Sequence, residues 1–141
     1  MNFNKGDIIM GLTVNAKNLS DENSYDCGYI TFMQFRLQLA ETYNKEFGEL
    51  YKKWCMSNIT ENECKRMNKI SNEDLDILLD HSDCDGKFIP KECKKIYEVI
   101  KDFKMDMQGH NYGIMKPYNM LEQWKGIFKH CYKNRVNLYF S

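Results

Sequence analysis

The stretch HSDCDGKFIPKE, residues 81–92, is the clearest motif of this chain. Apolar residues at helical spacing precede it in residues 75–79 and follow it in residues 93–103. Pro90 is well placed as the first residue of the second helix, where its missing N–H costs nothing. The sequence therefore predicts a helix–loop–helix unit over residues 71–104.

The loop of this unit resembles the twelve-residue calcium loop of the EF-hand family. Asp83 and Asp85 take the third and fifth positions. Gly86 takes the sixth, where the chain turns sharply, and Glu92 takes the twelfth, where a bidentate carboxylate completes a calcium site. His81 departs from the family, which has aspartate at the first position, because imidazole is a poor ligand for a hard cation. Three interpretations stay open: weak calcium binding, binding of a softer metal, and a turn in which the carboxylates accept backbone N–H groups, which we favour.

The whole chain, residues 1–141, is predicted to be one α+β domain with about five helices. Residues 8–16 and 135–140 have the patterns of strands. We expect these terminal strands to pair in a small sheet, because a lone strand leaves its backbone groups unsatisfied. Residues 1–9 are a candidate N-terminal extension.

Capping patterns and prolines mark the predicted helix starts. These starts are Thr31, Thr60 with Glu63, Ser71 with Asp74, Pro90 and Pro117. Gly48 is expected to end or weaken the first helix. Residues 105–116 are predicted to be a loop, and the last helix to end at Asn134.

The composition excludes several classes of protein. The 141 residues carry 20 Lys and Arg against 20 Asp and Glu, so the net charge is zero. A general binder of nucleic-acid polymers or of anionic membranes needs a basic excess. No apolar run approaches the roughly 20 residues of a membrane span. Six cysteines without a secretory signal predict reduced thiols and a cytoplasmic location.

Several side chains are candidate ligand contacts. Arg36 lies beside the apolar face of its helix, where a guanidinium needs a partner. That partner is either a carboxylate such as Asp26 or a phosphate or carboxylate of a ligand. The segment 108–113 combines donors, an aromatic ring and two glycines, and is a candidate to close over a planar or phosphorylated ligand. The predicted ligand contacts are Tyr25, Arg36, His110, Asn111, Tyr112 and Arg135.

Three further stretches resemble small uncharacterised proteins of bacteria and their phages. They are LLDHSDCDGKFIPKEC at 78–93, SYDCGY at 24–29 and NRVNLYF at 134–140. Small phage proteins of this size often block a host protein or sequester a nucleotide immune signal, and the resemblance implies a role of this kind in the host cytoplasm.

The sequence has no GxSxG, P-loop, HExxH or GxGxxG pattern, and we predict that it is not an enzyme. Its first predicted function is a counter-defence sponge for a nucleotide-derived signal. The alternatives are a calcium- or metal-binding module and an inhibitor that binds a host protein. No cofactor other than calcium is suggested, and self-association is left open.

Overall fold

The structure is a computed structural model that describes residues 11–19, 25–82, 85–111 and 114–140. Some sequence predictions lie outside these residues: the extension 1–9, Asp83 and Tyr112. For three other candidate contacts only the backbone is described: Tyr25, His110 and Asn111.

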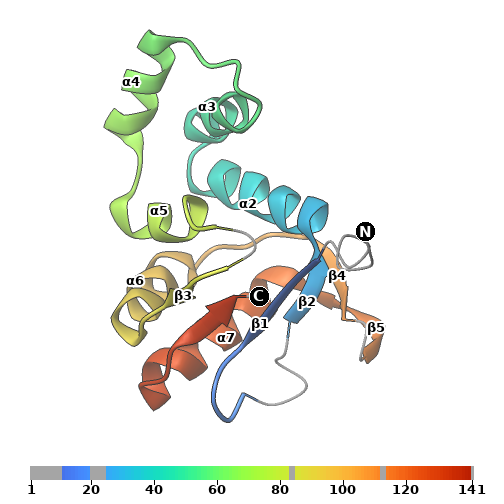
Figure 1. The fold of residues 1–141 in the computed structure, drawn as a ribbon. Coiled ribbons are helices and arrows are strands. Elements are labelled where there is room, and N and C mark those ends of the chain that lie inside the picture. The colour runs from blue at the N-terminus through green and yellow to red at the C-terminus, as the bar shows by residue number, and fades with distance from the viewer. Residues whose placement is uncertain (1–10, 20–24, 83–84, 112–113, 141) are drawn as a thin grey trace, which may run out of the picture.

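The described residues form six helices and two antiparallel sheets, an α+β fold as the sequence predicts (Figure 1). The helices are α2 Tyr29–Tyr43, α3 Lys45–Cys55, α4 Glu61–Ile70, α5 Glu73–Leu79, α6 Pro90–Ile100 and α7 Met120–Asn134. The strands are β1 Gly11–Asn15, β2 Tyr25–Gly28, β3 Lys87–Phe88, β4 Gln108–Asn111, β5 Ile114–Asn119 and β6 Leu138–Phe140.

The larger sheet joins the two ends of the chain, and its strand order is β2-β1-β6-β3. Val14 of β1 lies opposite Phe140 of β6, so the predicted pairing of the terminal strands is confirmed. On its other edge β6 pairs with β3, where Lys87 lies opposite Tyr139. Leu138 is buried while Tyr139 is 46% exposed, which is the alternation expected of a strand with one face on the core.

The predicted first helix is two helices, which is why the structure has six helices and not five. The break lies at Asn44, whose side-chain oxygen accepts the N–H of Phe47 at 2.9 Å and caps α3. Gly48 does not end the helix as expected but lies inside α3. A Cβ atom at Gly48 would lie 2.6 Å from the Cα of Glu41 on α2, so glycine allows the two helices to approach closely.

The next three helix starts follow local capping chemistry. The Thr60 hydroxyl accepts the Glu63 N–H at 3.2 Å, and the Glu63 carboxylate accepts the Thr60 N–H at 3.0 Å, so the predicted capping box is confirmed. Pro90 is the first residue of α6, as predicted. The start predicted at Ser71 is wrong by one residue, because the side chain of Asn72 accepts the N–H groups that open α5.

The predicted loop at residues 105–116 is wrong, because β4 and β5 pair there as a hairpin. Pro117 lies in β5 and not at the start of the last helix. That helix begins at Met120, because Asn119 accepts the N–H of Glu122 at 3.0 Å and caps it. It ends at Asn134, as predicted.

The core is built around Trp124 of α7, which is fully buried. Four phenylalanine rings surround it at centroid distances of 5.4–6.1 Å: Phe32, Phe35, Phe128 and Phe140. Figure 1 shows α2 and α5 between this core, where α6, α7 and the larger sheet lie, and the outer pair α3 and α4. The outer pair therefore projects from the body (Figure 1).

Candidate functional site: a groove between α2, α3 and α5

Two adjoining pockets lie where the outer helices meet α2 and α5. The first, of about 320 Å³, includes Arg36 in its wall, and we call it the Arg36 pocket. The second, of about 240 Å³, includes Asp76, and we call it the Asp76 pocket. Tyr51, Trp54 and Asp80 line both pockets. Because they share these three residues, we refer to the two pockets together as the groove.

The floor of the groove is aromatic because α3 places rings on one face at helical spacing. Phe47 and Tyr51 stack with their centroids 6.1 Å apart, and Tyr51 and Trp54 stack at 5.8 Å. Tyr51 is buried, whereas the indole of Trp54 is 42% exposed. The row therefore ends in an aromatic face that a ligand can reach.

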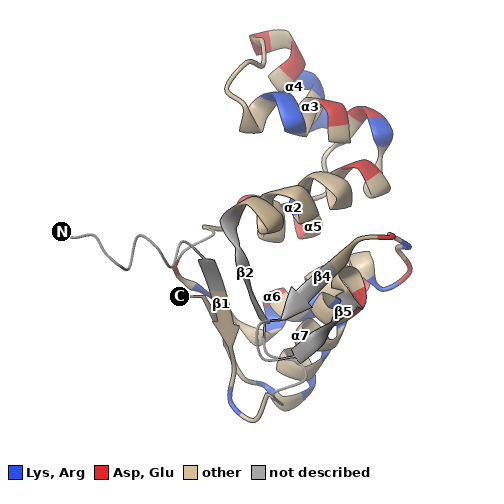
Figure 2. Cartoon of the chain, turned by 90° about the vertical axis from the view of Figure 1, so that its right-hand side faces the viewer, with Lys and Arg blue, Asp and Glu red and all other residues tan. Residues whose placement is uncertain are grey.

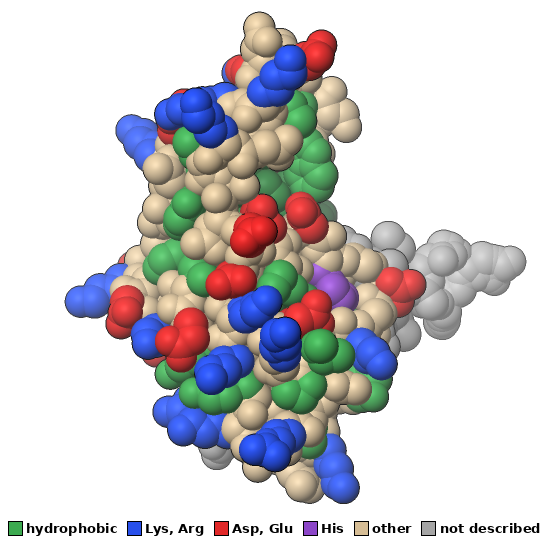
Figure 3. Space-filling view, turned by 90° about the vertical axis from the view of Figure 1, so that its left-hand side faces the viewer, with side chains coloured by type: hydrophobic (Ala, Val, Ile, Leu, Met, Phe, Trp, Pro, Cys, Tyr) green, Lys and Arg blue, Asp and Glu red, His purple; other side chains and the backbone are tan. Residues whose placement is uncertain are grey.

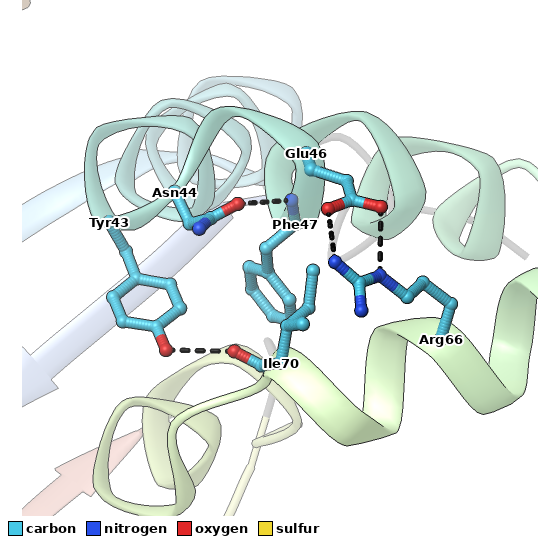
Figure 4. Close-up of polar contacts among 6 residues, drawn as sticks. All are labelled: Tyr43, Asn44, Glu46, Phe47, Arg66 and Ile70. Atoms are coloured by element: carbon cyan, nitrogen blue, oxygen red, sulfur yellow. Dashed lines mark hydrogen bonds and ion pairs between the residues drawn. The ribbon is translucent and has the colours of Figure 1, made fainter.

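The wall formed by α4 is tied to α3 and to the end of α2 (Figure 4). Arg66 of α4 makes a two-pronged ion pair with Glu46 of α3, at 2.8 and 2.9 Å. The Tyr43 hydroxyl at the end of α2 donates to the Ile70 carbonyl at the end of α4, at 2.8 Å. Figure 2 shows Lys and Arg together with Asp and Glu on α3 and α4, above the mostly uncharged α2. Such exposed ion pairs each contribute little, so the aromatic packing and the backbone contacts hold this wall.

Arg36 contacts one carbonyl at the end of α5 and one just after it. Its Nη1 donates to the Leu79 carbonyl at 3.2 Å and its Nη2 to the His81 carbonyl. Its guanidinium also lies 4.3 Å from the centroid of the Phe32 ring. These two acceptors are backbone carbonyls, and the side chain of Asp26, the carboxylate partner named from the sequence, lies outside the described part of the structure. Arg36 thus satisfies carbonyl groups that a helix end leaves without intrahelical donors.

Carboxylates face the same groove. Burial raises the pKa of Asp76, and the negative charge of Asp80 raises it further. Burial also raises the pKa of Asp80, while the positive charge of Arg36 lowers it. Burial likewise raises the pKa of the Cys55 thiol in the Arg36 pocket. The groove therefore combines an aromatic floor with hydrogen-bond acceptors in its wall.

The charges around the groove follow the helices that carry them. Figure 3 shows Asp and Glu side chains across the middle of one face, at the level of α5, and Lys and Arg side chains below them, at the level of α6. Glu73, Asp74 and Asp76 all lie on α5. Acidic side chains therefore gather on α5, the helix that brings Asp76 into the wall of the Asp76 pocket.

The described residues of the EF-hand-like loop contact the protein itself. His81 Nδ1 lies 2.7 Å from the Ser82 carbonyl and Nε2 lies 3.3 Å from the Lys87 carbonyl. Its ring packs on Phe88, with the centroids 4.1 Å apart. The Glu92 carboxylate accepts the N–H of Ile89 at 2.9 Å and caps α6. Within the described part of the chain, which leaves out residues 83–84, no three His, Cys, Asp or Glu side chains form a group suited to a metal ion.

Of the other predicted contacts, the structure describes only the side chain of Arg135. Arg135 is exposed at the end of α7, in the left-handed conformation with φ of 55°, and does not line either pocket. Tyr25 lies in β2 and both His110 and Asn111 in β4, strands that lie against each other. The sequence analysis did not single out Trp54 or Asp80 as contacts. The apolar face of residues 50–54 was a signal for the first, but nothing local distinguishes Asp80 from other helix-end carboxylates.

Comparisons of the chain with models of known protein families, with curated proteins and with solved structures each found no match. In the described part of the chain, every helix is too short or too polar to cross a membrane. The resemblance to phage and bacterial proteins therefore stays a prediction, and the function has to be argued from the groove.

Proposed function

We propose that the protein is a non-enzymatic binding protein that captures a small planar ligand in the Arg36 pocket. The observation that supports this most is the exposed indole of Trp54 at the edge of a pocket of about 320 Å³. Ligand pockets usually begin at about 300 Å³ and combine apolar walls with a few polar groups. The rings of Phe32 and Tyr51 supply the apolar surface, and Asp80 and Ser82 supply polar groups.

A nucleotide-derived signal is the ligand that we propose first. Its base would stack on Trp54, a contact that is worth about 1–3 kcal/mol for bases on aromatic side chains. Its phosphates would stay outside the groove, because the negative carboxylates of Asp76 and Asp80 repel the negative phosphates. For a phage-encoded protein, such capture in the host cytoplasm would remove an immune signal without altering it.

Calorimetry with a panel of cyclic nucleotides and ADP-ribose derivatives tests this function. We expect heat from at least one compound, quenching of Trp54 fluorescence, and recovery of the compound unchanged. Trp54→Ala should abolish binding. Met56 is an exposed apolar residue that does not line either pocket, so Met56→Ala should leave binding intact. No heat from any compound, or recovery of an altered product, would overturn the proposal.

Inhibition of a host protein is a second candidate, favoured by exposed apolar side chains at the start of α2 and the end of α3. Ile30 and Met33 at the start of α2 are 76% and 44% exposed, and Met56 after α3 is 59% exposed. Apolar side chains gathered at one end of a helix pair are typical of protein interfaces. Ile30→Ser with Met56→Ser should abolish co-purification of a host protein and leave nucleotide binding unchanged; capture that survives both changes would exclude this surface.

The calcium-binding module stays an alternative, supported by Gly86, whose φ of 94° makes the sharp turn that a calcium loop needs. If calcium binds, a millimolar concentration should raise the melting temperature. Asp83→Ala with Asp85→Ala should abolish that rise. An unchanged melting curve of the original protein would remove this alternative.

A further inference from the structure

We propose that the Arg36 pocket recognises the base of its ligand and selects guanine, which the Asp80 carboxylate would bind while Trp54 stacks on the ring. This inference rests on the proposed capture of a nucleotide-derived ligand and names the base. It is carried by the position of Asp80, by its hydrogen-bonding state and by the edge chemistry of the four bases.

Asp80 is held in place from both sides. It is the C-terminal cap of α5, and its N–H donates to the Asp76 carbonyl at 2.8 Å. Arg36 donates to the carbonyls of Leu79 and His81, the two residues that flank Asp80 in the chain. One side chain from α2 therefore fixes the backbone at Asp80. This contact holds the Cα atom from which the carboxylate extends, at a residue that lines both pockets.

The Asp80 carboxylate still has its acceptors available. Among the residues that the structure describes, it takes part in no hydrogen bond and no ion pair within 4 Å, and Arg36 acts on it only as a nearby charge. A carboxylate offers two oxygens, which accept two parallel N–H groups. A ligand with two adjacent donors on one edge would satisfy both oxygens.

Guanine is the base that offers this edge. Its N1–H and its exocyclic N2 amine lie side by side and both donate. Adenine and cytosine present one amine beside a ring nitrogen that accepts, so the second carboxylate oxygen would face a lone pair. Hypoxanthine keeps N1–H but lacks the amine, and is the closest probe for the second contact.

The sugar and phosphates are not expected to add affinity in the groove. Asp76 lies one helical turn from Asp80 and contributes a second negative charge to the adjoining pocket. Guanosine and guanosine monophosphate should therefore bind within threefold of each other. A site that gripped phosphate would instead prefer the monophosphate at least tenfold.

Titration of tryptophan fluorescence with guanosine, inosine and adenosine tests the proposal, and Trp54→Ala separates the signal of Trp54 from that of the buried Trp124. Guanosine should bind the unaltered protein at least tenfold more tightly than inosine or adenosine. Asp80→Asn should weaken guanosine at least tenfold, because its amide offers one acceptor beside a donor, and should change inosine less. Glu73→Gln is the matched control: it removes one charge from an exposed position on the same helix, away from both pockets, and should stay within twofold.

The outcomes separate the base preference from the proposed function. If nucleosides bind but inosine equals guanosine, the guanine preference is wrong and the binding function stands. Equal weakening by Glu73→Gln and Asp80→Asn would mean that Asp80 acts only through its charge, which also overturns the proposal. If no nucleoside or nucleotide binds, both the function and the base preference fail. The comparison of guanosine with inosine needs no variant, so it decides the question even if Asp80→Asn does not fold.

Discussion

The Leu79 carbonyl is shared by two donors, and this sharing makes a quantitative prediction. The carbonyl accepts from Arg36 Nη1 at 3.2 Å and from the Tyr51 hydroxyl at 3.0 Å. Leu79 is 1% exposed, so water cannot replace a lost donor. Arg36→Met and Tyr51→Phe each remove one donor from this carbonyl while keeping most of the side-chain volume.

The two single changes should cost unequal amounts. Tyr51→Phe removes one neutral hydrogen bond and should lower the free energy of unfolding by about 1 kcal/mol. Arg36→Met removes two charge-assisted bonds, to Leu79 and His81, and its contact with Phe32. Since each such bond contributes roughly 1.5–3 kcal/mol when buried, and this site is partly buried, we expect a loss of about 2–4 kcal/mol.

The double variant should cost more than the sum of the two single variants. Either single change leaves the Leu79 carbonyl with one donor, whereas both together leave it buried with none. An unsatisfied buried carbonyl costs about 1–3 kcal/mol, so the coupling free energy should be at least about 1 kcal/mol. Urea unfolding of the original protein and the three variants measures it, because m-values that agree keep the comparison valid. Additivity within about 0.3 kcal/mol, the usual behaviour of independent sites, would refute the shared-acceptor argument.

Two further predictions concern α3 and its neighbours. Gly48→Ala gains about 1 kcal/mol of helix propensity but places Cβ 2.6 Å from the Glu41 backbone. We expect the steric effect to dominate, with a net loss of about 1–2 kcal/mol of stability and a lower melting temperature. A higher melting temperature would show that the two helices move apart without cost. The pKa of Glu63 is lowered from 4.5 to about 2, first by Lys53 and then by the Thr60 N–H. The stabilising effect of the Glu63 carboxylate should therefore be present above pH 4.5 and lost as the pH falls towards 2. The melting temperature should depend less on pH over this range in Glu63→Gln, and an unchanged dependence would contradict the assignment.

Features set by neighbouring residues could be predicted from the sequence. The capping box of Thr60 and Glu63 and the start of α6 at Pro90 depend on contacts within four residues. The pairing of β1 with β6 was predicted for a different reason. A lone strand leaves its backbone N–H and C=O groups unsatisfied, so the two terminal strands were expected to pair with each other. Local chemistry and backbone satisfaction together were enough for the α+β class.

Other features that distant residues determine could not be predicted. Gly48 was expected to end or weaken a helix because glycine is a poor helix former, yet its role is set by Glu41 on another helix. The β4–β5 hairpin was taken as a loop because polar residues and glycines fill it, and its strands depend on cross-strand bonds that leave no periodic apolar pattern. Asn119 with Glu122 carried a capping signal that would have placed the start of α7 correctly.

The candidate site was predicted in part, and the reason lies in the kind of contact. Arg36 was singled out because a guanidinium near an apolar face needs a partner, and a pocket does lie beside it. Two of its partners are backbone carbonyls 43 and 45 residues away, and every residue has a carbonyl, so sequence alone cannot distinguish them. The carboxylate that this contact positions, Asp80, was missed for the same reason.

The position of Arg36 also explains how one residue can shape a site without binding the ligand. Its fork ties α2 to the end of α5, and Tyr51 of α3 donates to the same Leu79 carbonyl, so three walls of the groove meet at one backbone group. A groove fixed in this way needs little reordering when a ligand enters, and less of the binding free energy is lost to immobilisation. We therefore expect Arg36 to affect ligand affinity through the backbone that it holds at Asp80, and not through its positive charge. An arginine at this position is thus accounted for without a direct contact between its guanidinium and a ligand phosphate.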